Sequence, residues 1–285
     1  MPVKTPSTNE SVAKATAGIG LLHLARFVVG FVAQPLIAHN LGLRWQADAY
    51  AVSTEIVQRV WLLFEKVINP AFLPNFIAAM KEEGEDRAWQ LASTAVWLVA
   101  LALLITTPLA WLGMPYLVHA LAQKSQPEAI DLTIRAARFL LFGLFFLGFS
   151  SLTYTILNGY KRFAYAALGD TFWKLGVFGG AAIAYWRYGG ALGALAKKAK
   201  QIPLTAAENA QILELAEKSL WLIVTGYVVG AALKLLPHLL AIGSKWRLLK
   251  PKIDLSDPLT RKMFALALPL LLGSGQVGID PVFST

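Results

Sequence analysis

The stretch WQLASTAVWLVALALLITTPLAW, residues 89–111, contains no Asp, Glu, Lys or Arg. A helix needs about 20 consecutive apolar residues to cross the hydrocarbon core of a bilayer, so this stretch predicts a membrane-spanning helix. Backbone that spans lipid must be helical or part of a closed barrel, and runs of this length exceed a barrel strand. We therefore predict an all-α polytopic membrane protein with spans at 17–39, 49–68, 89–111, 136–157, 163–186, 219–242 and 263–283.

The composition supports a membrane protein and excludes several kinds of chemistry. The chain has 285 residues, of which 56% are hydrophobic and only 15% charged, far fewer charges than a soluble domain carries. It contains no cysteine, which excludes disulfides and thiolate metal sites. The sequence shows neither a P-loop nor a GxSxG elbow. We therefore expect that the protein is not an enzyme and has neither catalytic residues nor a cofactor. We also expect no metal site, because the histidines are scattered over different segments: His23, His39, His119 and His238.

The distribution of Lys and Arg predicts the orientation. More of these residues lie in the segments on the N-terminal side of the membrane than on the other side, which places the N-terminus in the cytoplasm. The net charge of +9 is better explained by topology and lipid-headgroup contacts than by nucleic acid. The expected organisation is a cytoplasmic segment (1–16), a six-helix lobe (17–242) with an outer loop (187–218), a basic cytoplasmic loop (243–262) and a seventh helix (263–285).

The outer loop contains a helix-start signal. Thr205 and Glu208 have capping-box spacing, and Ile212, Leu213 and Leu215 follow them with helical periodicity. We expect a short amphipathic helix that either lies at the outer interface or extends the sixth span.

Ionisable residues recur on one face of several expected spans. In the second span, Asp48, Glu55, Arg59 and Lys66 fall within about 40° of one another on a helical projection. Charges in spans are costly and usually face a bundle interior or a hydrated cavity, so these faces predict a hydrated cavity. Two other expected spans carry polar residues on one face: Arg26 and Gln34 in the first span, and Asp170 and Lys174 in the fifth.

A structural explanation competes with the cavity. Glu55 with Arg59, and Asp170 with Lys174, are at i,i+4 spacing and are equally consistent with pairs that hold helices together. The same structural explanation would place Lys234 and His238 at the inner interface.

Four segments resemble the MurJ/MviN lipid II flippase family. ADAYAVSTEIVQRVWLLFEKVINPAFLPNF (47–76) resembles the family's second-helix region, with Asp48, Glu65 and Pro74 at pattern positions. ILNGYKRFAYAAL (156–168) is similar to its LN-x-x-x-RF segment. VVGAALKLLPHLLAIG (228–243) and PKIDLSDPLTRKMFALALPLLLGSGQVGID (251–280) look like the stretches around its sixth and seventh helices.

The resemblance implies the multidrug/oligosaccharidyl-lipid/polysaccharide exporter fold, in which two six-helix lobes face a central cavity. This chain would supply the N-terminal lobe and the first helix of the second, as a fragment or as a dimerising half-transporter. The implied activity is alternating-access flipping of undecaprenyl-pyrophosphate-linked peptidoglycan precursor across the bacterial inner membrane. The expected partners are this lipid, membrane lipids and cell-wall synthesis proteins, with possible coupling to an ion gradient or the membrane potential.

The resemblance assigns roles to the polar residues of the spans. Cationic side chains would hold the pyrophosphate, and the other polar residues would orient them or form gating contacts. Ala33 and Gln34 stand where the family's first helix carries an Arg-Asp pair, and Arg59 alone represents a double arginine. The expected substrate-binding residues are Arg26, Arg59, Lys66 and Lys174, and the expected orienting residues are Asp48, Glu55, Gln34 and Asp170.

The sequence is also consistent with two alternative functions. One is a polysaccharide-lipid exporter or a cation-coupled drug exporter of the same superfamily; a drug exporter would favour a net acidic cavity. The other is a non-transporting membrane scaffold for cell-wall synthesis, which would tolerate loss of the charged face.

Overall fold

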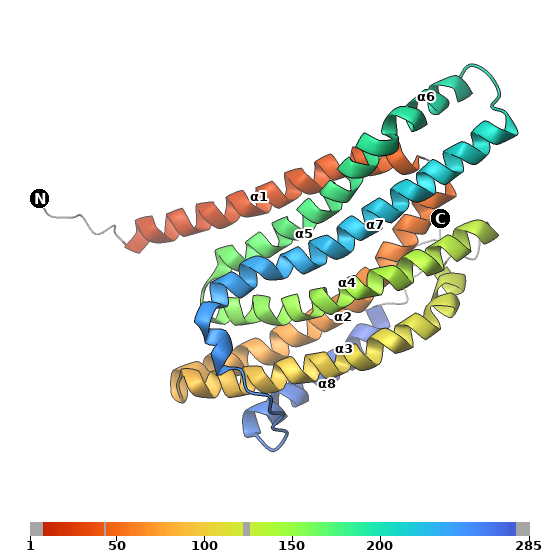
Figure 1. Cartoon of the computed structure of the whole chain (residues 1–285). Helices are drawn as coiled ribbons and strands as arrows, with labels where there is room; N and C mark the ends of the chain where they lie inside the picture. Colours follow the sequence, from red (N-terminus) through yellow and green to blue (C-terminus); the bar gives the residue numbers. More distant parts are fainter. Residues whose placement is uncertain (1–7, 43, 122–125, 278–285) are drawn as a thin grey trace, which may run out of the picture.

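The chain folds into long helices without strands over the described residues, which are 8–42, 44–121 and 126–277 of a computed structural model (Figure 1). The expected all-α fold is confirmed. Residues 1–7 of the expected N-terminal segment and 278–283 of the expected seventh span lie outside the described residues. The helices are α1 (Thr8–Leu41), α2 (Trp45–Glu82), α3 (Glu85–Leu121), α4 (Pro127–Gly159), α5 (Phe163–Ala184), the π-helical turn η1 (Tyr185–Gly189), α6 (Gly190–Ala199), α7 (Ala206–Ile242), the 3₁₀ helix η2 (Gly243–Leu248) and α8 (Pro258–Val277).

Within the described residues, four segments are long and apolar enough to cross a membrane: Gly20–Leu41, Glu85–Leu121, Pro127–Gly159 and Ala206–Leu248. The protein is therefore a polytopic helical membrane protein. The helices α2, α5 and α8 have 38, 22 and 20 residues but are not among these four by composition. The spans expected there stay predictions; α2 and α5 carry the ionisable residues discussed below.

The closest helix–helix packing joins α5 to α7, and glycines make it possible. A Cβ built at Gly176 would lie 2.3 Å from the Cα of Gly230, and one at Gly180 would lie 2.5 Å from the carbonyl oxygen of Leu222. Small residues allow membrane helices to approach backbone to backbone. Helix α4 packs against α2 and α7, so its middle lies in the core, with Leu140, Leu144 and Leu147 fully buried.

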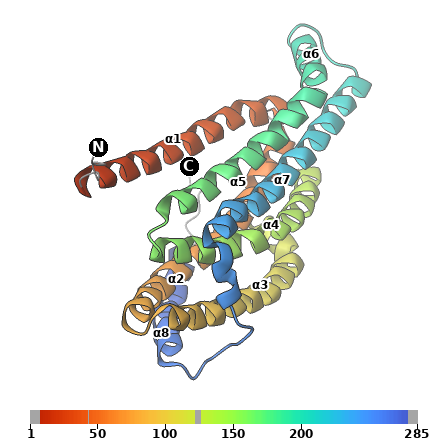
Figure 2. The same cartoon turned by 60° about the vertical axis from the view of Figure 1, so that its left-hand side comes forward.

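The helices α1 and α8 lie on opposite flanks of this core. Helix α1 packs mainly on α5 and diverges from the rest of the bundle towards its N-terminal end (Figure 2). Helix α8 packs along α2. Both views show α3 curving towards its C-terminal end, in the half that contains Pro108 and Pro115. Proline interrupts helix hydrogen bonding, which accounts for such curvature.

The segment 187–218 is not a loop, and that expectation is wrong. The π-helical turn η1 and helix α6 continue α5 beyond the bundle, and α7 starts at Ala206 after a short connection (Figure 1). Thr205 and Glu208 form the expected capping box, which starts α7 early. Of the two alternatives for this helix, the extension of the sixth span is confirmed.

The second span is also longer than expected. Helix α2 continues through Pro70 and Pro74 to Glu82, although the sequence suggested an end near residue 68. The prolines have no N–H, so the carbonyls of Lys66 and Pro70 lose their helical donors, yet the helix continues. Asn75 adds a side-chain hydrogen bond in this region, from its N–H to the carbonyl of Ala71 at 2.8 Å.

The linker 249–257 is attached to α3 by side chains. Ser93 accepts a hydrogen bond from the backbone N–H of Lys250 at 2.9 Å, and Trp97 donates to the carbonyl of Lys250 at 3.2 Å. Asp257 pairs with Arg87 of α3 and also accepts from the first backbone N–H groups of α8. Asp257 therefore caps α8 and fixes it to α3 at the same time.

Candidate substrate-binding site

The centre of the candidate site is Asp170 in α5, whose carboxylate contacts side chains from both α1 and α7. Its Oδ2 accepts from Nη1 of Arg26 in α1 at 2.9 Å, and its Oδ1 lies 2.8 Å from Nζ of Lys234 in α7. The Asp170 side chain is only 18% exposed. A carboxylate buried this far needs charged partners, and here both oxygens have one.

Lys234 is the most deeply buried cation of the group, with a side chain 4% exposed. Its ammonium lies 4.7 Å from the ring centroid of Trp61 and 5.5 Å from that of Trp173. Trp61 is held by a 2.9 Å hydrogen bond from its indole N–H to Ser151. The ion pair and the aromatic faces together compensate for the loss of water around the charge.

Lys174 and Glu65 complete the cluster electrostatically. Lys174 lies 5.1 Å from the centroid of Trp173 and interacts with the charges of Arg26, Asp170 and Lys234. Glu65 of α2 interacts with the charges of Lys234 and Asp170. Three cations thus share two carboxylates, so the cluster between α1, α2, α5 and α7 has an excess of positive charge that suits an anion.

The face of α2 forms a second group, which is more exposed. Arg59 pairs with Glu55 at 2.6 Å, one helical turn apart, as expected for an i,i+4 pair. Asp48 and Lys66 lie on the same face, are exposed, and make no ion pair among the described residues. Gln34 of α1 is exposed as well. Of the eight expected site residues, the structure brings Arg26, Asp170 and Lys174 into one cluster and Glu55 and Arg59 into another.

Two parts of the structural alternative for these residues are wrong. Asp170 bonds Arg26 and Lys234 rather than Lys174, because the neighbouring helices offer better-placed cations than its own. Lys234 and His238 do not reach the inner interface. His238 is fully buried, with Nδ1 2.9 Å from the hydroxyl of Thr153 and Nε2 3.3 Å from the carbonyl of Ala166, so it joins α4, α5 and α7.

The sequence contained one signal that identifies Lys234. Lys234 lies eight residues before the end of α7, which is about 12 Å along the helix axis. This distance is long even for a lysine side chain that extends towards the interface, so a partner inside the bundle was the better expectation. The partners Trp61 and Trp173 had no comparable signal, because aromatic residues are common in any span.

The bundle and its charged interior define a class: a polytopic helical membrane protein with a cluster of ionisable residues between its helices. The family model "Lipid II flippase MurJ" matches residues 37–283. This match covers most of the chain, which therefore belongs to the MurJ lipid II flippase family, a family of transporters and not of enzymes.

Individual relatives agree with this assignment. The chain is 27% identical over 169 residues to a probable lipid II flippase MurJ of Rhizobium tropici, which is 58% of this chain and 32% of the relative. It is 26% identical over 166 residues to the corresponding protein of Rhizobium meliloti (strain 1021), covering 57% of this chain and 31% of that one.

The fold is that of a solved flippase. A structure of lipid II flippase MurJ in an inward closed conformation superposes with a TM-score of 0.66 at 15% identity, covering 92% of this chain and 48% of that one. The chain thus spans about half the length of the solved flippase and about a third of the curated relatives it matches.

Proposed function

We propose that this chain provides a substrate-contacting lobe of a flippase that moves a lipid-linked pyrophosphate, undecaprenyl-pyrophosphate-linked peptidoglycan precursor, from the inner to the outer leaflet. The match of the family model over residues 37–283 is the observation that carries this proposal. The protein would lie in the bacterial inner membrane with a cytoplasmic N-terminus and would work by alternating access. Proteins of cell-wall synthesis would be its partners.

The cationic residues would bind the diphosphate of the lipid. Arg26 and Lys174 come from the buried cluster, and Arg59 and Lys66 come from the exposed face of α2. The planar guanidinium of an arginine matches two phosphate oxygens, which makes Arg26 and Arg59 the strongest candidates. Asp48, Glu55, Gln34 and Asp170 would orient these cations or exchange partners as the lobe moves.

The transport cycle would be driven by an ion gradient or the membrane potential. Moving one elementary charge across a membrane is worth about 2.3 kcal/mol per 100 mV, so a cycle that carries a net charge responds strongly to the potential. A cluster with an excess of positive charge is suited to such a response.

Complementation tests the proposal. The complete reading frame that encodes this chain is expressed in a bacterium depleted of its own lipid II flippase, together with Arg26→Ala and Arg59→Ala variants. We expect growth with the wild type and at least a tenfold loss of colony formation with each variant, because each removes a phosphate ligand. Arg135→Ala is the matched control, since Arg135 is an exposed arginine of α4 outside both clusters.

Two results would contradict the proposal. Failure of the wild type to restore growth, although it reaches the membrane, would exclude flipping of this substrate. Equal rescue by all variants would contradict the assignment of Arg26 and Arg59 as phosphate ligands. It would favour a scaffold role, because a scaffold does not need the charged face.

A further inference from the structure

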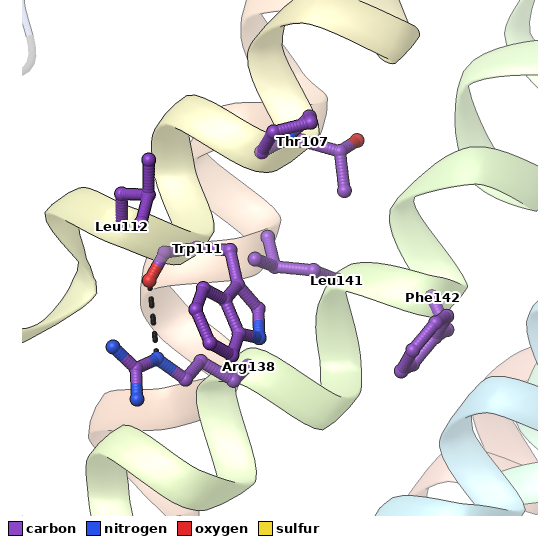
Figure 3. Close-up of a pocket in the computed structure, with 7 residues that line it drawn as sticks. Thr107, Trp111, Leu112, Arg138, Leu141 and Phe142 are labelled. Carbon is purple, nitrogen blue, oxygen red and sulfur yellow. Dashed lines mark hydrogen bonds between the residues drawn. The ribbon is translucent and has the colours of Figure 1, made fainter.

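A hollow of about 370 Å³ opens between α3 and α4, outside both charged clusters (Figure 3). Thr107, Pro108 and Leu112 of α3 and Leu141 and Phe142 of α4 form its walls. The surrounding surface is apolar: Leu112 and Phe142 are 63% and 64% exposed. In a polytopic membrane protein, such a surface faces hydrocarbon.

Arg138 is the only charged residue among those that line the hollow, and its position has a specific cause. Pro115 has no N–H, so the carbonyl of Trp111 loses the helical donor four residues later. Nε of Arg138 donates to this carbonyl at 3.1 Å instead, and the guanidinium carbon lies 4.1 Å from the centroid of the Trp111 ring. These two contacts fix the plane of the guanidinium.

The terminal nitrogens of Arg138 remain available for a ligand. Nε donates to the carbonyl of Trp111 and the guanidinium carbon lies near the Trp111 ring, whereas Nη1 and Nη2 make no hydrogen bond within the described part of the chain. Figure 3 shows both nitrogens pointing away from the indole. Two parallel N–H donors match two oxygens of one phosphate.

The order of residues along the two helices puts the charge at one end of the hollow. Leu141 and Phe142 follow Arg138 in α4, and Thr107 and Pro108 precede Trp111 in the antiparallel α3. The apolar walls therefore extend from Arg138 towards the middle of the bundle. An amphiphile with an anionic head and a hydrocarbon tail fits this direction.

The surface inside the hollow is apolar. The hydroxyl of Thr107 is buried without a hydrogen bond among the described residues, so a ligand in the hollow does not reach it. The hollow therefore suits a hydrocarbon chain.

We propose that this hollow binds one anionic phospholipid of the surrounding bilayer, with its phosphate on Arg138 and an acyl chain along α3 and α4. A single arginine neutralises one phosphodiester, whereas a pyrophosphate needs more cations than this hollow contains. The site is separate from the substrate path, so it does not depend on the proposed flipping activity. Phosphatidylglycerol is the simplest lipid with this chemistry.

Native mass spectrometry of the purified protein tests the site. Phosphatidylglycerol or phosphatidylcholine is titrated into detergent micelles, and the fraction of protein that retains one lipid is measured. We expect a preference for phosphatidylglycerol and about tenfold weaker retention in Arg138→Gln, since a charged hydrogen bond contributes about 1.5 kcal/mol or more. Leu112→Trp, which fills the hollow from the surface, should weaken retention while leaving Arg138 in place.

Arg135→Gln is the control, because Arg135 lies one turn earlier in α4 and is engaged by Asp131 and Glu217. It should retain phosphatidylglycerol within about twofold of the wild type. Equal losses in Arg135→Gln and Arg138→Gln would show general charge attraction and overturn the site. Equal retention of both phospholipids, or displacement of phosphatidylglycerol by undecaprenyl pyrophosphate at a much lower concentration, would overturn the assigned lipid class.

Discussion

At the scale of single residues, Asp170 is the group on which the charged interior depends. It is the counter-ion that Arg26 and Lys234 share, and it connects α1 and α7 through α5. Removing one partner of a buried ion pair leaves an uncompensated charge, which costs more than the pair itself contributes.

Substitutions of Asp170, Lys234 and Arg26 should therefore lower the stability of the protein by different amounts. Asp170→Asn removes the ion-pair partner of both Arg26 and Lys234 and should destabilise most, by about 4 kcal/mol. Lys234→Met leaves Asp170 with Arg26 alone and should cost about 3 kcal/mol. Arg26→Gln should cost least, because the Arg26 side chain is 38% exposed and water replaces part of the interaction. Melting temperatures in detergent measure the order.

The double variant Asp170→Asn/Lys234→Met is the control for this series. It removes both charges of the deepest pair and should be more stable than Asp170→Asn alone. Additive losses in the double variant would mean that the two residues do not interact, contrary to their 2.8 Å separation.

The residues of the site were only partly predictable from the sequence. Arg26, Asp170, Lys174 and the Glu55–Arg59 pair were identified because a charge inside an apolar run is conspicuous. The partner of Asp170 was not, because sequence spacing reports neighbours on one helix, and Lys234 reaches Asp170 from another helix.

At the scale of the elements, the contact between α5 and α7 depends on the absence of side chains. A Cβ at Gly176 would come within 2.3 Å of the backbone of Gly230, so Gly176→Ala must push the two helices apart. We expect a loss of about 2 kcal/mol or more in stability. Gly179 lies one turn further along α5 and has no atom within 4 Å of a built Cβ.

Gly179→Ala is therefore the matched control. It should be neutral or slightly stabilising, because alanine favours helix more than glycine does. Thermal unfolding of the two variants in the same detergent decides the matter: similar losses in both would mean that α5 and α7 are not in backbone contact.

The stability of the folded protein should depend on pH through Asp257, in the linker between α7 and α8. Burial raises the pKa of this carboxyl, but the paired Arg87 guanidinium and the N–H groups at the start of α8 outweigh burial and lower the pKa of Asp257 below its usual range. A lowered pKa in the folded state stabilises the protein above the unfolded value of about 3.9, and this stabilisation is lost as the pH falls through the folded pKa.

Asp257→Asn should remove this dependence. The melting temperature of the wild type should exceed that of the variant near neutral pH, and the difference should shrink as the pH falls below about 4. A difference that stays constant down to the lowest pH at which the protein folds would show that the charge of Asp257 does not hold α8 to α3.

At the scale of the whole molecule, the helical membrane fold was predictable because apolar runs of span length have few alternatives in lipid. The lengths of the helices were not. Helix α2 passes through Pro70 and Pro74, and α5 and α7 extend past their apolar cores as η1, α6 and the capped start of α7. Hydropathy reports the part of a helix that lies in lipid, whereas caps such as Thr205 decide where it begins.

The most direct test of the proposed function is the position of the lipid-linked precursor in cells depleted of their own flippase. The complete reading frame is expressed, and an enzyme added from outside cleaves precursor in the outer leaflet. We predict that the wild type restores cleavage and that Arg26→Gln combined with Arg59→Gln lowers it at least tenfold, with Arg135→Gln unchanged. If precursor stays protected with the wild type present in the membrane, the chain does not take part in flipping this lipid.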